Sequence, residues 1–448
     1  MADARVRRID AAAMIDAGLA VVEPASVVVD PATGRIVDAG PRDDVASRVP
    51  AAPAEDWGDV LLIPGLVNGH AHTFQSLLRG PGDDLDFARW VSGVLYPSAG
   101  WLTAEDLETG ALLAAADMLL AGITTVAEFF YVNDQGNANA ARVVDAMRST
   151  GIRTVFGRAL YDGGRGPARY REAPAEAGER VIELAERYAG DPLVRVVPAP
   201  HSLHAASGEA IRVGAAVAQR LDGVFTIHVA EAAYEVEQLH GRTGLTPAAY
   251  LYELGALGPR TVMVHGVCLT DADLLMAASE GARIVHNPGA NAFLGDGIAP
   301  LLRMRELGIP VALGTDGGCT NNRLSILDEM HLAPLLQRAV RLDGSVVGAR
   351  DAFAMATVEG AGVFDLPTGQ LRAGALADVV ALDLRDPALM PATDLVSSVV
   401  HAASSRAVRR VMVHGRDVVV DGRLATVDLD DLRGRVRRTA ARAHAGRA

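Results

Sequence analysis

The stretch LLIPGLVNGHAH, residues 61–72, determines the fold that the sequence predicts. Residues 61–67 form an apolar, strand-like run, and two histidines, His70 and His72, follow at its end. Apolar strands that end in polar side chains are typical of parallel sheets, where functional groups gather at the carboxyl ends of the strands. The same pattern recurs along the next part of the chain.

Seven further strand-like runs follow, at 124–130, 153–160, 194–199, 224–229, 261–264, 282–285 and 310–313. Amphipathic segments lie between most of them, for example at 107–120, 177–188, 208–221 and 271–279. Strands that alternate with helices predict βαβ units and a parallel sheet. Eight such units over about 300 residues fit a (β/α)8 TIM barrel better than an open doubly wound sheet. We therefore expect an α/β chain with a (β/α)8 barrel over residues 62–366.

Short β-branched runs occur at both ends of the chain, at 20–22, 26–29, 378–382, 408–414 and 418–420. Turns that contain Pro or Gly separate these runs, which is typical of small antiparallel strands. We expect residues 1–61 and 367–448 to form one composite β-sandwich domain beside the barrel. Two unrelated caps are the alternative.

The composition is that of a packed globular protein rather than a disordered one: 448 residues, 50% hydrophobic and 22% charged, with a formal net charge of −13. The acidic balance argues against binding to nucleic acid or to anionic membranes. No apolar run is long enough to predict a transmembrane helix. The two cysteines cannot form a disulfide framework, which favours a reducing, cytoplasmic location.

The chain contains no lysine. This excludes Schiff-base catalysis, a P-loop lysine and a binuclear metal site bridged by a modified lysine.

Side chains with metal-binding or acid–base chemistry gather at the predicted strand ends: His70, His72, Glu128, His201, His204, His228, Glu231, His265, His286 and Asp316. In a barrel these ends share one face, so the residues predict one site.

A metal site follows from the residue types. His70 and His72 lie two positions apart on an extended segment, so their side chains point the same way. With His228 and Asp316 they give three imidazoles and one carboxylate, which suit Zn²⁺ and tolerate Fe²⁺. We expect one divalent ion, which lowers the pKa of a bound water and makes hydroxide available near neutral pH. A structural histidine pair is the alternative.

Three residues suit acid–base work around that hydroxide. Asp316 can accept the proton of the water, and Glu231 can carry it to a leaving nitrogen as general acid. His265 can orient the hydroxide or the tetrahedral centre. A core histidine at 265 and an ordinary helix-start acid at 231 are the alternatives.

Several motifs together resemble the amidohydrolase superfamily, in its mononuclear deaminase and chlorohydrolase-like branch. They are PGLVNGHAH (64–72), GITT (122–125), HVAE (228–231), VHG (264–266), LGTDG (313–317) and GALADVV (374–380). The resemblance implies metal ligation by His70, His72, His228 and Asp316, with Glu231 and His265 as catalytic partners. It also implies a homo-oligomer such as a dimer.

Other segments are similar to formimidoylglutamate deiminases: HTFQ (72–75), AEFFY (127–131), PHSL (200–203) and LGDG (294–297). That similarity implies that Gln75, Tyr131 and His201 line the substrate site, and we expect Trp90 and His204 to line it as well. Those enzymes carry arginines where this chain has His204 and Val91. Guanidinium is the natural bidentate partner of a carboxylate, so the departure argues against formimidoylglutamate itself.

Segments such as FQSLLR (74–79) and GIAP (297–300) are similar to deaminases of purines, including oxidised guanine. The sequence thus predicts a metal-dependent hydrolase of non-peptide C–N bonds that deaminates a small amidine-like or heterocyclic molecule. A cyclic-amide hydrolase and a dehalogenating hydrolase of the same fold are alternatives, as is a non-catalytic barrel. Glu231 disfavours dehalogenation, because chloride leaves without a proton.

Overall fold

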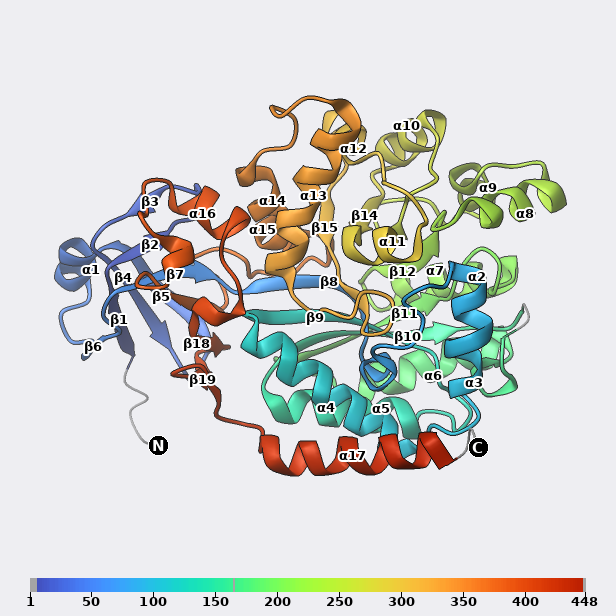
Figure 1. Cartoon of the computed structure of the whole chain (residues 1–448), viewed down its shortest axis with the longest axis horizontal. Coiled ribbons are helices and arrows are strands. Elements are labelled where there is room, and N and C mark those ends of the chain that lie inside the picture. Colours follow the sequence, from blue (N-terminus) through green and yellow to red (C-terminus); the bar gives the residue numbers. More distant parts are fainter. Residues whose placement is uncertain (1–5, 164–165, 446–448) are drawn as a thin grey trace.

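The computed structural model describes residues 6–163 and 166–445. Parallel strands alternate with helices around a barrel (Figure 1). The barrel strands are β8 (Leu66–His72), β9 (Ile123–Phe130), β10 (Arg153–Leu160), β11 (Val194–Pro200), β12 (Phe225–Val229), β13 (Thr261–His265), β14 (Arg283–His286), β15 (Val311–Leu313) and β16 (Asp316–Gly317). The last two are successive pieces of one strand path, so the predicted eight-stranded barrel is confirmed.

Two parallel sheets form the barrel, in the orders β11-β10-β9-β8-β16 and β12-β13-β14-β15. Ser202, just after β11, forms a parallel bridge with His228 of β12. At the other junction Gly314 N donates to His286 O at 2.9 Å, and Thr315 N donates to His70 O at 3.1 Å. The final strand path therefore joins β14 to β8 and closes the ring.

The outer layer consists of α4 (Ala104–Leu120), α5 (Ala138–Thr150), α6 (Pro174–Arg187), α7 (Gly208–Arg220), α8 (Ala233–Thr243), α9 (Pro247–Glu253), α10 (Asp271–Glu280), α11 (Pro288–Leu294), α12 (Leu301–Glu306), α13 (Ile326–Arg341), α14 (Ala349–Ala356) and α15 (Val358–Val363). The four predicted helices coincide with α4, α6, α7 and α10. Between β8 and α4 the chain forms η1 (Thr73–Leu78), α2 (Phe87–Trp90), η2 (Val91–Leu95) and α3 (Tyr96–Ser98).

Capping boxes fix where α4 and α10 begin. Thr270 Oγ1 accepts a hydrogen bond from Asp273 N at 3.2 Å, and Asp273 Oδ2 accepts one from Thr270 N at 3.0 Å. Thr103 and Asp106 make the same pair of bonds at the start of α4. These reciprocal bonds satisfy backbone donors that the first turn of a helix leaves free.

Small and β-branched side chains fill the barrel interior, among them Ala127, Val155, Val197, Val264, Val285 and Ala312. Because this apolar plug occupies the inside of the ring, polar side chains of the strands are confined to its ends.

The remaining strands come from both ends of the chain and lie side by side (Figure 1). They are β1 (Arg7–Ala11), β2 (Ala13–Ile15), β3 (Val21–Val22), β4 (Ala25–Asp30), β5 (Arg35–Pro41), β6 (Ala54–Asp56), β7 (Val60–Pro64), β17 (Val379–Asp383), β18 (Val408–Val413), β19 (Arg416–Val420) and β20 (Arg423–Leu424). They form two sheets, β5-β4-β1-β6 and β20-β19-β18-β17-β7-β2-β3, that share one apolar core. The β-sandwich predicted from both termini is confirmed.

The prediction of one barrel strand over residues 61–67 was wrong. Gly65 separates two strands: β7 pairs with β17 in the sandwich, and β8 belongs to the barrel. A side chain at Gly65 would place its Cβ 2.1 Å from Thr124 Oγ1, so only glycine fits between the two layers. We therefore propose that the barrel domain begins at Leu66 rather than at residue 62.

Three further helices belong to the terminal segments: α1 (Arg42–Arg48), α16 (Leu395–His401) and α17 (Leu429–Ala445). The last one runs along α4 on the outside of the barrel (Figure 1). Thr439 Oγ1 donates to Asp106 Oδ1 at 2.6 Å, which ties α17 to the start of α4. Within the described ranges, no helix combines the length and the apolar character that crossing a membrane requires.

Candidate active site

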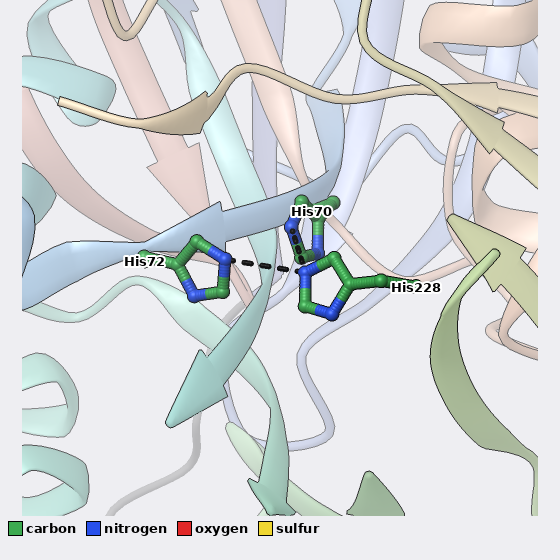
Figure 2. Close-up of side chains that lie close together, drawn as sticks. All are labelled: His70, His72 and His228. Atoms are coloured by element: carbon green, nitrogen blue, oxygen red, sulfur yellow. Dashed lines mark hydrogen bonds between the residues drawn. The ribbon is translucent and has the colours of Figure 1, made fainter. Parts of the chain in front are cut away.

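The four side chains predicted as metal ligands converge at the carboxyl ends of β8 and β12 and at the first residue of β16. The three imidazoles face one another (Figure 2), with His228 Nε2 3.2 Å from His70 Nε2 and 3.3 Å from His72 Nε2. Asp316 Oδ1 lies 3.2 Å from His70 Nε2 and 3.4 Å from His72 Nε2. All four side chains are buried. The ligand atoms of His70, His72 and His228 lie within 4.8 Å of one another, and so do those of His70, His265 and Asp316, so both sets could hold a cation.

Backbone carbonyls orient two of these imidazoles through Nδ1, the ring nitrogen that faces away from the cluster. His72 Nδ1 lies 2.7 Å from Phe129 O, and His228 Nδ1 lies 2.6 Å from His201 O. A carbonyl only accepts, so each Nδ1 carries the proton and each Nε2 presents its lone pair to the cluster. Burial lowers the pKa of His72 to about 3 and the pKa of His228 well below its ordinary value. Both rings are therefore neutral at pH 7, as metal ligation needs.

Asp316 supplies the negative charge of the cluster. Burial opposes its ionisation, but the hydrogen bond with His70 and the adjacent imidazoles lower the pKa of Asp316 below its usual range. Its backbone has φ = 58°, a left-handed conformation that is strained for a residue other than glycine. The next residue, Gly317, has no room for a side chain, because a Cβ would lie 1.7 Å from Gln75 Oε1. The fold thus forces the carboxylate toward the histidines.

Glu231 and His265 lie next to the ligand cluster. Glu231 Oε2 is 3.6 Å from His265 Nε2. Burial, together with the nearby charges of Asp296 and Glu235, raises the pKa of Glu231 well above its ordinary value. Both effects favour the protonated form of the Glu231 carboxyl group.

The hydrogen bonds of His265 fix which ring nitrogen carries its proton. Asn291 Nδ2 lies 3.0 Å from His265 Nδ1 and also donates to Asp296 Oδ2 at 3.3 Å. The contact with the carboxylate identifies the donor end of the amide, so His265 Nδ1 accepts. Burial lowers the pKa of His265 to about 4, and the proton of the neutral ring then sits on Nε2, facing Glu231.

A cavity of about 550 Å³ opens over the cluster. All five residues predicted to bind substrate line it: Gln75, Trp90, Tyr131, His201 and His204. Gln75 Nε2 donates to Tyr131 OH at 2.8 Å, and Cys319 Sγ donates to Gln75 Oε1 at 3.2 Å. Further walls come from aromatic side chains, namely Phe87, Tyr96, Tyr161, Tyr170 and Tyr234. The cavity suits a flat, largely uncharged molecule.

Two acidic residues near the site were not assigned a function from the sequence. Glu235, in the first turn of α8, accepts a hydrogen bond from Glu231 N at 3.1 Å through Oε2. Glu128 Oε2 accepts one from Thr73 N at 2.8 Å, directly after His72. The position of Glu128 at the end of a predicted strand indicated from the sequence that it lies near the site. For Glu235 the sequence offered no such indication beyond its place four residues after Glu231. Its contacts depend on how α8 packs against the barrel.

The match to known proteins covers most of the chain. The model of the Amidohydrolase family matches residues 61–418. A 5-methylthioadenosine/S-adenosylhomocysteine deaminase of Syntrophobacter fumaroxidans is 36% identical over 407 residues, 90% of each protein. A 5′-deoxyadenosine deaminase of Methanothermobacter thermautotrophicus is 34% identical, over 86% of this chain and 88% of that protein.

Among solved structures, an adenosine deaminase of Xanthomonas campestris with bound zinc has a TM-score of 0.91. It is 29% identical, and the match covers 98% of both chains.

Proposed function

Because this chain belongs to the amidohydrolase family, we propose that it is a zinc-dependent aminohydrolase that releases ammonia from the 6-position of adenine nucleosides. The substrates include nucleosides with a modified 5′ position, as in the names of its relatives. The observation that carries the proposal is the aromatic cavity over a cluster of three histidines and one aspartate, with Glu231 and His265 beside it. The cavity holds a flat ring, and the cluster holds the groups that hydrolysis needs.

The four ligands fit one divalent cation, because three neutral imidazoles and a carboxylate are the donors that Zn²⁺ prefers. Such an ion supplies Lewis acidity and lowers the pKa of water bound to it. We assign its ligands as His70, His72, His228 and Asp316.

The protein's own groups then move the protons. Asp316 accepts a proton from the attacking water, since its pKa is lowered and its carboxylate lies beside His70 and His72. Glu231 Oε2 gives its proton to the departing amino nitrogen, so that ammonia leaves rather than an amide anion. The Nε2–H of His265 faces Glu231 and would hydrogen-bond to the hydroxyl group that adds to C6, orienting the tetrahedral centre.

The cavity also argues against an anionic amino-acid substrate. The positions that carry arginine in formimidoylglutamate deiminases hold Val91 and His204, and both line the cavity. Neither side chain offers the paired donors of a guanidinium. The homo-oligomer and the cytoplasmic location expected from the sequence remain predictions.

Ammonia release from the zinc-loaded protein tests the proposal. We expect turnover with adenosine, 5′-methylthioadenosine and 5′-deoxyadenosine, each giving the 6-oxo product. We expect none with N-formimidoyl-L-glutamate or with amino-triazines. Turnover of these last compounds alone, or of no nucleoside while zinc is bound in a 1:1 ratio, would contradict the proposed substrate class.

A further inference from the structure

The turn at the end of α11 brings a carboxyl group to the polar side chains behind His265. Gly295 ends the helix with φ = 73°, a left-handed conformation that glycine adopts without strain. The backbone N–H groups of Gly295 and Asp296 both donate to Asn291 O, the second at 2.9 Å. These bonds form a Schellman motif, which returns Asp296 to the helix that the chain has just left.

Asp296 and His265 share the amide group of Asn291. Asn291 Nδ2 donates to Asp296 Oδ2 at 3.3 Å and to His265 Nδ1 at 3.0 Å. Asn291 is buried, and its Oδ1 has no hydrogen-bond partner among the described residues. The two bonds of Nδ2 are therefore what fixes the orientation of this amide.

The orientation of the Asn291 amide decides which nitrogen of His265 carries the proton. With Nδ2 toward the ring, Nδ1 accepts, and the proton of the neutral imidazole lies on Nε2, 3.6 Å from Glu231 Oε2. If the amide turned over, Oδ1 would face the ring and draw the proton to Nδ1. Asn287 Nδ2 also lies 3.2 Å from His265 Nδ1, but no second acceptor among the described residues fixes its direction.

We propose that Asp296 is a positioning residue for the deamination, because it holds Asn291 so that His265 keeps its proton on Nε2. A carboxylate only accepts, so it attracts the NH2 end of the amide and repels the oxygen. Asp296 acts through Asn291 and His265 and not on the substrate. The inference rests on the proposed function, since it gives Asp296 a part in the same reaction.

NMR of the zinc-loaded protein labelled with ¹⁵N-histidine locates the proton directly. Burial raises the pKa of Asp296 to about 7, so spectra at pH 8.5 report on its ionised form. We expect the wild-type His265 to show a protonated Nε2 and an unprotonated Nδ1, in signals that are absent from H265Q. In D296A the Nδ1–H form should appear as well, because Asn291 is free to turn over.

The kinetics of adenosine deamination show what this proton contributes to turnover. We expect kcat of D296A to fall about tenfold with KM unchanged, the effect of one hydrogen bond lost in the transition state. D296N should keep most of kcat and the Nε2–H signal, because its amide oxygen still accepts from Asn291. The control D271A removes an exposed carboxylate at the start of α10 and should change neither.

A double-mutant cycle tests whether Asp296 acts through Asn291. N291A removes the shared amide and should lower kcat at least as much as D296A. Adding D296A to N291A should then cost nothing more. The Schellman motif uses the backbone of Asp296 and not its side chain, so D296A should keep the fold, which its thermal midpoint checks.

A wild-type His265 whose Nε2 carries no proton would overturn the inference. So would an unchanged proton position in D296A, equal losses of kcat in D296A and D296N, or additive losses in the cycle. Failure of the wild type to deaminate any nucleoside is a different result. It overturns the proposed function and the catalytic part of this inference, while the NMR signals still show whether Asp296 sets the position of the proton.

Discussion

At the scale of single residues, the site depends on where each proton sits. The ordinary difference in acidity between aspartate and glutamate is enlarged here: the pKa of Asp316 is lowered by imidazoles and the pKa of Glu231 is raised by burial. Two carboxyl groups that border one cavity are thus biased toward opposite protonation states. Pairs of this kind divide base and acid work between them.

Asp316→Asn should abolish most turnover, because the attacking water would lose its proton acceptor. We expect kcat to fall by about 10²- to 10⁴-fold, the range for loss of a general base. Steady-state ammonia release measures it, and the zinc content of the variant shows how much of the effect comes from lost ligation. Turnover near the wild-type level would contradict the assignment.

Glu231→Gln should lower kcat by a similar factor of about 10²–10⁴, because the amide cannot give a proton to the leaving nitrogen. Glu231 is outside the ligand cluster, so zinc content should equal that of the wild type. Elemental analysis alongside the kinetics separates the two properties. A variant that loses zinc together with activity would instead place Glu231 among the ligands.

Much of the site could be predicted at this scale because the residues stand at strand ends. His70 and His72 share a face of one strand, and Asp316 ends the last strand, so topology alone brings them together. Glu235 could not be found this way. Its two contacts, with Glu231 N and His204, depend on the docking angle of α8, which no local pattern records.

At the scale of elements, the junction of β8 and β9 carries an unusual carboxyl group. Burial raises the pKa of Glu128 from 4.5 to about 8, although Thr73 N donates to Oε2. Because the folded pKa lies above the unfolded one, the protein loses stability as the pH rises between these two values. The loss amounts to roughly 3–5 kcal/mol when complete.

Glu128→Gln should remove this pH dependence, since its amide is similar in shape to the protonated acid. Denaturant unfolding at pH 5 and pH 9 should show the variant gaining on the wild type at the higher pH. Glu128→Ala is the control: it leaves Thr73 N without an acceptor, so we expect a loss of about 1–3 kcal/mol at both values. If the stability of the wild type and of E128Q changed equally with pH, Glu128 would not be the source of the pH dependence.

The start of α10 offers a test without catalytic consequence. Thr270→Ala removes the side-chain half of the capping box with Asp273. The expected cost is about 1 kcal/mol of stability, with kcat and KM unchanged, because α10 begins away from the cavity. A thermal or urea midpoint equal to that of the wild type would show that the cap contributes nothing.

The positions of the strands were predicted more accurately than the strands with which they pair. The apolar pattern located most strands to within a few residues, but it joined β7 and β8 into one. The residues before Gly65 and those after it are both apolar. The hydrophobic pattern therefore cannot show that β7 belongs to the sandwich and β8 to the barrel. Only the pairing of β7 with β17, a strand far along the chain, separates them.

At the scale of the whole molecule, one buried ion pair joins the barrel to the sandwich. Arg153, at the start of β10, donates to Asp378 through Nη2 at 3.0 Å and Nε at 3.3 Å. Asp378 also accepts from Thr368 Oγ1 and His414 N. Both charged side chains are nearly inaccessible to water.

Arg153→Met should destabilise the protein by about 3–5 kcal/mol, because it leaves a buried carboxylate without its countercharge. Urea unfolding measures the loss, and Arg187→Ala, which removes an exposed pair with Asp145, should cost less than about 1 kcal/mol. Similar small losses in both variants would mean that the domains do not rely on the buried pair.

The closing of the barrel also sets when the site can form during synthesis. The proposed metal ligands come from β8, β12 and β16, and Asp316 reaches the histidines only when β16 pairs with β8. A nascent chain that ends before this strand has the imidazoles but not the carboxylate. About seven tenths of the chain must therefore leave the ribosome before all four proposed ligands can meet, so we expect the complete site to form late in synthesis.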